Sequence, residues 1–325
     1  MQQFYSIIDV SETERWNKAL ENVPHSFAHT AEHCKAVHID TGHRTFLYLF
    51  EKDDVKICCP LMERDFNGSK DIAKPFGISG FTGNGTHPDF YRTWRSFIER
   101  KGYISGYLGI HPLYGKKDWF PAENIYPHNT VQVLDIRPEA DTILANMSSG
   151  RRRQLSKWSE IRYNLTSNRY DIQHFFLNHY QDFLDSKQAA SYYYFSDISM
   201  KSFFNAERSI IVGAVEDNKV VSAAFFGYTD FLADYLFIFS LPNKNYHTAH
   251  LIWYSILELK EIGVPLLNLG GGGQGISEFK RRFGAYERPM FSVKEVYEET
   301  TYTQLIGNKS ADVRNHEGYF PLYRK

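Results

Sequence analysis

The sequence contains a faint internal repeat, which constrains the fold more than any other feature because a duplicated unit has to fold twice in the same way. Two apolar stretches around an acidic turn occur at 46–61 and again at 211–226, and each predicts a β-hairpin. The two turns begin at Glu51 and Glu216, 165 positions apart. The repeat therefore predicts two similar domains.

A second pair of landmarks repeats at nearly the same offset. A helix-like stretch over 89–100 runs into Gly102 and then into an apolar strand, and a stretch over 250–261 runs into Gly263 and another strand. The two glycines are 161 positions apart. Together the landmarks predict a repeated unit of hairpin, third strand, helix and further strand.

Further stretches predict the rest of the two domains. A capping box at 11–14 predicts the start of a helix, and 171–187 predicts a longer helix with aromatic residues three and four apart. More strands are predicted at 234–240, 266–269 and 290–298. The expected fold class is α/β (α+β), with a mixed, mainly antiparallel sheet flanked by helices in each of two tandem domains, residues 1–147 and 148–325.

Composition excludes several classes of function. With 37 Lys and Arg against 38 Asp and Glu, the chain has no overall basic field, so we expect no DNA binding. Three cysteines form neither a disulfide framework nor a zinc spacing, which favours a reducing compartment. No window resembles a secretory leader or a membrane span, so we expect a cytoplasmic protein with no membrane span.

Histidines at positions 25, 29 and 33 are spaced so that one helix face could carry them, but no carboxylate or cysteine completes a ligand set. We therefore expect no metal. The glycines of 270–275 formally satisfy the dinucleotide pattern, with Glu295 beyond them. A nicotinamide site needs a full helix after those glycines, and 283–289 stops any helix there within a few residues, so a turn with close backbone approach is the better interpretation.

Motifs in both halves carry a resemblance to a known family. In the second half they are the stretches 247–253, 263–271 and 275–284, and in the first half they are 107–113 and the proline- and glycine-containing loop 74–80. With these motifs the chain resembles the FemAB branch of the GNAT acyltransferase superfamily over nearly its whole length. The resemblance implies two tandem GNAT-like domains and transfer of an aminoacyl or acyl group to an amine, in many relatives from aminoacyl-tRNA during peptidoglycan cross-bridge synthesis.

The chain departs from the family pattern in two places. Asn268 stands where relatives often have Asp, so a carboxylate base is absent there. Only a short helix fits between Met147 and Tyr163, which leaves no room for the coiled-coil arm of some cross-bridge enzymes. The armless forms are therefore the expected relatives.

The resemblance implies a catalytic role for Lys280, with Phe279 packed beside it. The alternative is that Lys280, Arg281 and Arg282 form a solvated helix face. Because Asn268 is no base, His250, Glu278 or the substrate itself has to accept the amine proton. The expected catalytic residues are therefore Lys280, His250 and Glu278.

The resemblance also implies that the basic stretch 151–157 binds phosphates of a nucleotide-linked acceptor, since guanidinium groups suit phosphate oxygens. An exposed linker with solvated charges is the alternative. His111 and the tyrosines near it are candidates for an acceptor groove. The residues expected to bind substrates are Arg152, Arg153, Lys157, Tyr107, His111, Asn268, Gly270, Gly271 and Phe279.

The expected function is transfer of an acyl or aminoacyl group to an amine of a peptidoglycan or polysaccharide precursor, the acceptor being a nucleotide- or lipid-linked sugar or muropeptide. No tightly bound cofactor is expected, and the donor is aminoacyl-tRNA or acyl-CoA. A tRNA donor needs a basic surface, which 151–153 and the basic residues of 280–288 could supply. The GNAT loop for CoA phosphates is not matched at 243–249, which favours a donor other than CoA. Two alternatives remain open: an acyl-CoA-dependent N-acetyltransferase acting on an amino sugar, and a non-catalytic protein that binds a glycan precursor.

Overall fold

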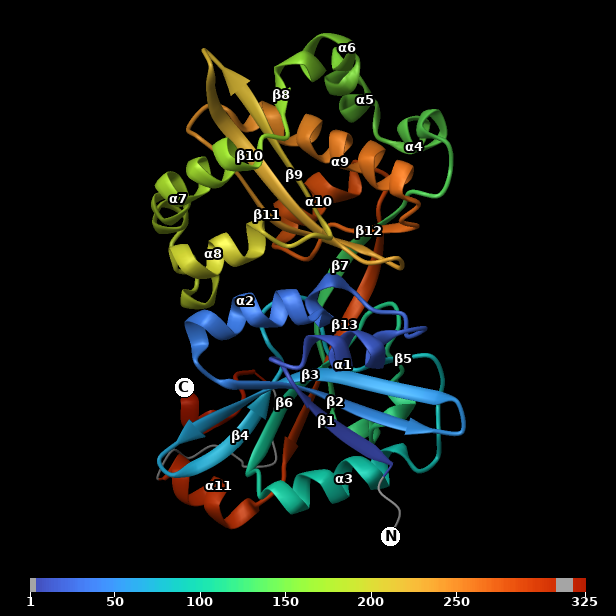
Figure 1. The fold of residues 1–325 in the computed structure, drawn as a ribbon, viewed down its shortest axis with the longest axis vertical. Helices are drawn as coiled ribbons and strands as arrows, with labels where there is room; N and C mark the ends of the chain where they lie inside the picture. Colours follow the sequence, from blue (N-terminus) through green and yellow to red (C-terminus); the bar gives the residue numbers. More distant parts are fainter. Residues whose placement is uncertain (1–3, 308–317) are drawn as a thin grey trace. The chain divides into compact units, whose positions relative to one another are not determined.

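The computed structural model describes residues 4–307 and 318–325. The chain forms two compact units (Figure 1). Unit 1 comprises residues 1–129 and 289–325, and unit 2 comprises residues 130–288. Each unit contains a mixed sheet flanked by helices, as the expected fold class requires.

In unit 1, every neighbouring pair of strands is antiparallel except β4 and β6, which are parallel. A short strand, β5 (Thr82–Gly83), pairs with β3 outside this order. The strands of unit 1 in spatial order are β1 (Tyr5–Asp9), β2 (Arg44–Lys52), β3 (Val55–Phe66), β4 (Ser69–Ala73), β6 (Ser105–Ile110) and β13 (Tyr286–Val296).

Unit 2 repeats this arrangement strand for strand, with one parallel pair, β11 and β12, in the corresponding place. Its strands in spatial order are β8 (Leu165–Thr166), β9 (Ser209–Glu216), β10 (Lys219–Tyr228), β11 (Ala233–Ser240), β12 (Leu266–Asn268) and β7 (Ile125–Asp135). The predicted duplication is therefore confirmed at the level of topology.

The two predicted hairpins share one turn geometry. Asp53 and Asp54 have φ values of 48° and 63°, and Asp217 and Asn218 have φ values of 48° and 60°. Two successive residues with positive φ form the two-residue turn whose twist matches that of antiparallel strands, and Asp and Asn tolerate this conformation better than most residues. The Asp and Asn residues of the repeated turns therefore allow the backbone conformation that both hairpins need.

The division into units differs from the expected boundary between residues 147 and 148. In the order of the repeat, β7 ends the first half and β13 ends the second, yet β7 pairs with β12 of unit 2 and β13 pairs with β6 of unit 1. Each half thus supplies the last strand of the other half's sheet. This exchange places residues 130–147 in unit 2 and residues 289–325 in unit 1.

Four helices of unit 1 each bury apolar side chains. The helices are α1 (Thr13–Leu20), α2 (Ala31–Thr41), α3 (Phe90–Lys101) and α11 (Glu299–Ile306). Helix α3 ends at Gly102, which has a φ of 66°, as the sequence predicted. The expected capping box does not form, because the hydroxyl of Ser11 bonds Asp9 and the helix begins one residue later, after Glu12.

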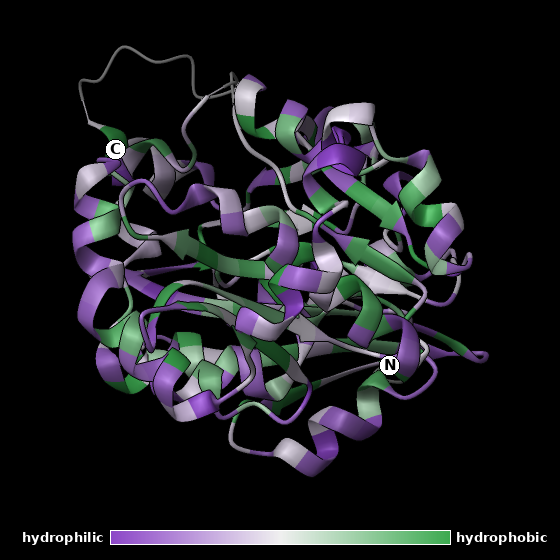
Figure 2. Ribbon diagram, turned by 90° about the horizontal axis from the view of Figure 1, so that it is seen from above, coloured by the Kyte–Doolittle hydropathy of each residue, from purple (hydrophilic) through white to green (hydrophobic). Residues whose placement is uncertain are grey.

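In unit 2, helices cover both faces of the sheet (Figure 1). Phe237 and Phe239 of β11 pack against aromatic residues of α7 and α8, whereas Ala224 and Phe226 of β10 lie in the cluster that includes α9. The central strands are largely hydrophobic, whereas the helices carry hydrophobic and hydrophilic residues side by side (Figure 2). The helices are α4 (Ala140–Asn146), α5 (Ser149–Leu155), α6 (Trp158–Ile161), α7 (Arg169–Ser186), α8 (Asp197–Phe204), α9 (Thr248–Ile262) and α10 (Gln274–Arg281).

The last residues of the chain are fastened to unit 1 by a buried carboxylate. Asp71 of β4 accepts hydrogen bonds from Arg64 Nε at 2.7 Å, Arg324 Nε at 2.6 Å and the hydroxyl of Tyr323 at 2.6 Å. The side chain of Asp71 is 0% exposed. Two of its three donors come from residues more than 250 positions away along the chain. This carboxylate therefore connects the two chain segments that form unit 1.

Three of the histidines singled out in unit 1 are buried as neutral groups. His29 Nε2 contacts the carbonyl of Gly80 at 2.9 Å, His33 Nε2 contacts the carbonyl of Phe76 at 2.8 Å, and the rings of His29 and His111 lie 5.4 Å apart. Burial lowers the pKa of His33 to about 4 and that of His111 to about 3. His29 and His33 face backbone carbonyls, whereas His111 Nδ1 accepts from the amides of Leu113 and Tyr114. The described part of the chain holds no group of three His, Cys, Asp or Glu side chains suited to a metal ion.

We expect acid to destabilise the protein through these histidines. Their pKa is depressed in the folded state, so their contribution to stability is present above about pH 6.5 and is lost as the pH falls toward 4. At pH 5 each of His33 and His111 costs about 2 kcal/mol. Urea unfolding at pH 7 and pH 5 measures this loss, and His111→Gln should lose about 2 kcal/mol less than wild type. A matched variant of the exposed His179 should lose as much as wild type, and equal losses for both variants would contradict the assignment.

Candidate functional site in unit 2

The candidate site lies where the parallel strands of unit 2 part. Strands β11 and β12 pair at only two positions, Ala233 with Leu267 and Asp234 with Asn268. Strand β12 ends there, while β11 runs on to Ser240 without this neighbour. The chain then passes through a glycine-rich turn, in which Gly270 has a φ of 75°, before helix α10 begins at Gln274. Helix α10 ends at Arg281, in agreement with the prediction that the stretch 283–289 stops any helix that begins after the glycines.

Asn268 holds this turn in place. Its side chain is almost fully buried, its Nδ2 donates to Asp234 Oδ1 at 2.9 Å, and its Oδ1 accepts from the amide of Gly270 at 2.9 Å. An aspartate at this position would place a second carboxylate against Asp234, which is unfavourable in a buried site. The departure from the family pattern is therefore explained by a partner on the neighbouring strand.

Lys280 lies beside this turn on α10. The residue is 5% exposed, and its Nζ donates to the carbonyl of Gly271 at 2.5 Å and lies 5.3 Å from the centre of the Tyr235 ring. Among the described residues, no carboxylate lies within ion-pair distance of Lys280. Burial lowers its pKa to about 8. Such an ammonium can donate hydrogen bonds to a developing negative charge, because only one of its three N–H groups is used by Gly271.

Arg281 and Arg282, which follow Lys280, are solvated, as the alternative interpretation expected, but Lys280 is not. Arg281 pairs with Glu278 at 2.9 Å and with Glu287 at 3.4 Å, and Arg282 pairs with Glu278 at 3.2 Å. All of these side chains are exposed. The basic surface expected over 280–288 is thus partly neutralised by carboxylates of the same segment.

Arg151 supports the residue that precedes Lys280. Its guanidinium lies 4.5 Å from the Phe279 ring centre and 4.1 Å from that of Phe283, and it donates to the carbonyl of Phe279 at 3.3 Å. Burial lowers the pKa of Arg151 to about 10. In the sequence, Arg151 is one member of a basic stretch. Its local sequence does not indicate that it is buried, because its ring partners lie far away along the chain.

The two candidate bases have partners in the structure. His250 on α9 faces the carbonyl of Gln154 through Nε2 at 3.1 Å and that of Tyr246 through Nδ1 at 3.3 Å, and burial lowers its pKa. Hydrogen bonds from Arg282 and Arg281 lower the pKa of Glu278, which makes it a weaker proton acceptor. His250 and Glu278 therefore already have hydrogen-bond partners within the protein. Of the three proton acceptors that the sequence suggested, the substrate is the one without such partners.

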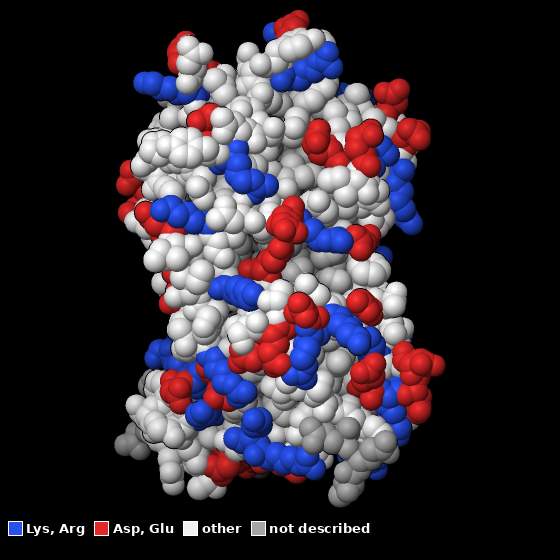
Figure 3. All heavy atoms as spheres, in the orientation of Figure 1, with Lys and Arg blue, Asp and Glu red and all other residues white. Residues whose placement is uncertain are grey.

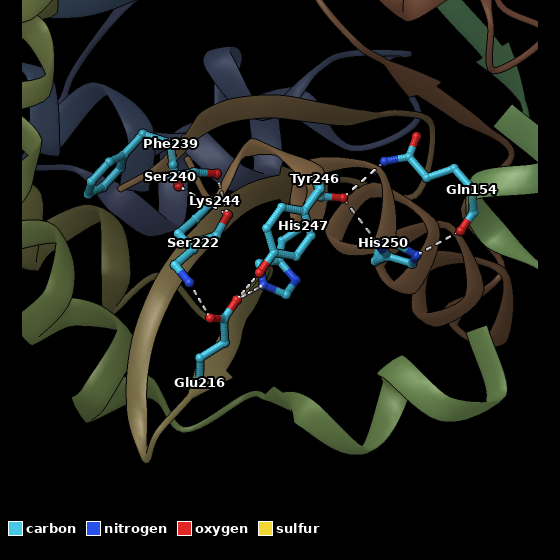
Figure 4. A network of polar contacts seen from close by, with 9 residues as sticks. All are labelled: Gln154, Glu216, Ser222, Phe239, Ser240, Lys244, Tyr246, His247 and His250. Carbon is cyan, nitrogen blue, oxygen red and sulfur yellow. Dashed lines mark hydrogen bonds and ion pairs between the residues drawn. The ribbon is translucent and has the colours of Figure 1, made fainter. Parts of the chain in front are cut away.

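A polar network fixes the start of α9 (Figure 4). Glu216 on the hairpin of β9 and β10 accepts hydrogen bonds from Lys244, Tyr246 and His247, the last at 2.6 Å from Nε2. The hydrogen bond from Lys244 is the largest cause that lowers the pKa of Glu216 to about 2. The amides of His247 and Thr248 are used by the short helical turn 245–247. An ionised carboxylate therefore lies beside the start of this helix.

The substrate-binding candidates of the basic stretch are exposed. Arg152 donates to the carbonyls of Ala145 at 2.9 Å and Met147 at 2.5 Å, closing the end of α4. Arg153 and Lys157 are exposed on α5 and at its end, and in the described ranges no carboxylate forms an ion pair with either. On the face drawn in Figure 3, basic and acidic side chains are interspersed, in keeping with the net charge of -1.

The remaining two candidates, Tyr107 and His111, belong to unit 1. The hydroxyl of Tyr107 accepts a hydrogen bond from Ser292 at 3.3 Å. His111 is buried and stacks on Tyr114 with ring centres 5.1 Å apart. The structure thus gathers Lys280, Asn268, Gly270, Gly271 and Phe279 in one part of unit 2, and it assigns Tyr107 and His111 to the other unit.

Comparison with known proteins defines the fold. No protein-family model matches the sequence, and no curated protein matches it. The crystal structure of FemX superposes with a TM-score of 0.66 at 10% sequence identity, covering 90% of this chain and 98% of FemX. The C-terminal domain of a putative lysylphosphatidylglycerol synthetase from Agrobacterium fabrum has a TM-score of 0.55 at 14% identity, covering 87% of this chain and 91% of that domain. L-PGS from Bacillus licheniformis has a TM-score of 0.54 at 13% identity, with 89% and 93% covered.

These likenesses establish the architecture. The chain shares the fold of FemX and of the lysylphosphatidylglycerol synthetase domain, and its two tandem units are those that the sequence resemblance implied. Within the residues that the structure describes, no helix is both long and apolar enough to cross a membrane.

Proposed function

We propose that this protein transfers an acyl or aminoacyl group to an amine of a cell-envelope precursor, with Lys280 at the reacting centre. The observation that carries the proposal is a buried ammonium, held at the turn where β11 and β12 part, that has no carboxylate partner among the residues that the structure describes. The fold likeness to FemX, and to a protein named for the synthesis of lysylphosphatidylglycerol, supports a transferase of this class.

The proposed reaction joins an amine to an activated carbonyl. The amine nitrogen attacks the carbonyl carbon of an ester or thioester, a C–N bond forms, and the carbonyl oxygen becomes an oxyanion. Lys280 stabilises this charge by a hydrogen bond in a site where little water competes. Collapse of the intermediate breaks the C–O or C–S bond, and the leaving group takes up a proton to balance the one that the amine loses.

We further propose that the chain holds the substrates on both sides of Lys280. The turn of Gly270 and Gly271 lets a substrate approach the backbone closely, since neither residue carries a side chain. Arg153, with Arg152 and Lys157, binds phosphates of a nucleotide- or lipid-linked acceptor. Their exposure supports this role, and so does the absence of carboxylate partners within residues 4–307 and 318–325, because none of those ion pairs has to be broken when a phosphate binds.

As the donor we propose aminoacyl-tRNA rather than acyl-CoA. The diphosphate of CoA needs backbone amides at the start of α9, and the amides of His247 and Thr248 already bond within the turn 245–247. The Glu216 carboxylate beside them repels a diphosphate.

This choice of donor predicts the response to CoA compounds. A ligand at 100 times its Kd adds about 2.7 kcal/mol of stability, which a thermal unfolding experiment detects easily. We expect acetyl-CoA and longer acyl-CoAs at millimolar concentration to leave the melting temperature unchanged. A clear rise with acyl-CoA would contradict the donor assignment and would favour an acyl-CoA-dependent N-acyltransferase.

A further inference from the structure

Unit 1 presents a polar face at the place that corresponds to the candidate site of unit 2. The parallel strands β4 and β6 part after Ala73 and Tyr107, as β11 and β12 part after Asp234 and Asn268. Along β6, alternate residues share a face, so Tyr107 and Gly109 point to the same side of the sheet. Their partners on β13, Lys294 and Ser292, point to that side as well.

Lys74 reaches this face from the end of β4. A Cβ atom placed on Gly109 would lie 3.2 Å from Cδ of Lys74, so the lysine side chain runs over that glycine. Its Nζ donates to the carbonyl of Gly77 at 2.8 Å, and burial lowers its pKa to about 8. In the described part of the chain, no carboxylate forms an ion pair with Lys74.

A second cation and a histidine complete the cluster. The Nζ of Lys294 donates to the carbonyl of Gly318 at 2.7 Å and lies 5.1 Å from the centre of the Tyr126 ring. The pKa of His128 on β7 is lowered by burial and, in addition, by the charges of Lys74 and Lys294. His128 and Tyr126 are alternate residues of β7, so both lie on the side of that strand that Lys294 contacts.

The carboxylates nearest along β4 and β13 have partners outside the cluster. Asp71 of β4 is bound by Arg64 and Arg324, and Glu295 of β13 points to the opposite side, where it accepts hydrogen bonds from Tyr91 and Trp94. Lys294 is 6% exposed, Lys74 and Tyr107 are half-buried and His128 is exposed, so His128 is the member of the cluster that is most open to solvent. A group with positive charge, hydroxyl donors and a route to solvent suits a multiply charged anion.

We propose that unit 1 binds a phosphate or diphosphate group at a site formed by Lys74, Lys294, His128 and Tyr107. The two ammonium groups supply charge, and His128 and the Tyr107 hydroxyl supply donors that orient the anion. The site goes beyond the proposed transfer reaction, because binding here requires neither Lys280 nor a donor. The phosphate can come from a free anion, a nucleotide-linked sugar or a lipid headgroup, which the test below separates.

The test is a binding titration of the full chain with inorganic pyrophosphate, UDP-N-acetylglucosamine and phosphatidylcholine vesicles that contain phosphatidic acid. We expect Lys74→Met to weaken binding of pyrophosphate at least tenfold. Lys101→Met, an exposed lysine at the end of α3, serves as the matched control and should bind as wild type. Binding of UDP-N-acetylglucosamine that is tighter than that of pyrophosphate and is weakened in Lys74→Met identifies a nucleotide-linked source. Binding of the vesicles that is weakened in Lys74→Met identifies a lipid source.

A second readout does not depend on affinity. The pKa of His128, followed by NMR, should rise in Lys74→Met because one repelling charge is removed, and it should rise in wild type when pyrophosphate binds. Absence of binding to all three probes would overturn the proposal. So would binding that survives in Lys74→Met and is lost in Arg153→Glu, since the anion would then bind the basic stretch of unit 2. Loss of binding in Arg153→Glu would support the acceptor site proposed for the basic stretch of unit 2, whereas transfer itself is assayed separately with Lys280→Met.

Discussion

Replacement of Lys280 by methionine is expected to lower the rate of transfer by about 10²–10³, the usual effect of removing one donor to an oxyanion. Methionine keeps the length of the side chain and removes the charge that Gly271 and the Tyr235 ring surround. The free energy of unfolding should stay the same or rise, because the buried ammonium is costly in the folded state. Turnover with saturating substrates and urea unfolding measure the two quantities.

The pH dependence of the wild-type enzyme follows from the same residue. Burial lowers the pKa of Lys280 to about 8, and only the ammonium form stabilises an oxyanion. The rate should therefore fall as the pH rises above about 8, and this limb should be absent from the residual activity of Lys280→Met. Lys201→Met, an exposed lysine on α8, is the matched control and should keep the wild-type rate and profile. Full activity in Lys280→Met would refute its role.

Replacement of Asp71 by alanine is expected to destabilise the protein by about 3–5 kcal/mol, the usual cost of removing one partner from a buried ion pair. The change leaves Arg64, Arg324 and the Tyr323 hydroxyl without the carboxylate that they share. It also releases the end of the chain from β4. The urea concentration at the midpoint of unfolding measures the loss.

The matched control for this variant is Asp65→Ala. Asp65 is exposed on β3, and it contacts Arg324 only through its backbone carbonyl, which alanine retains. Its replacement should change the free energy of unfolding by less than about 0.5 kcal/mol. Equal effects of the two substitutions would show that the buried carboxylate does not hold the end of the chain.

Local patterns predicted much of the fold. The acidic turns at 51 and 216 and the glycines at 102 and 263 each require a particular backbone conformation, so their spacing revealed the duplicated unit. The exchange of β7 and β13 was not predictable, because strand pairing between distant segments leaves no local periodicity. The boundary expected after residue 147 therefore does not account for the exchanged strands.

The site was predictable in part for a similar reason. The glycine-rich turn and the lysine after it form a local motif, so Lys280 could be singled out. The roles of its neighbours depend on partners from other elements: Asp234 explains Asn268, and the rings of Phe279 and Phe283 explain Arg151. Such contacts appear only when the strands and helices are assembled.

The most direct test of the proposed transfer reaction is detection of the transferred group on an acceptor. Purified protein is incubated with a mixture of aminoacylated tRNAs and, in separate reactions, with UDP-linked muropeptides or UDP-linked amino sugars, and the acceptor is analysed by mass spectrometry. We expect the acceptor to gain the mass of one aminoacyl group with the wild-type protein, and we expect almost no acceptor to gain this mass with Lys280→Met. An acceptor that binds tightly and never gains mass with any donor, acyl-CoA included, would contradict it and would indicate a non-catalytic binding protein.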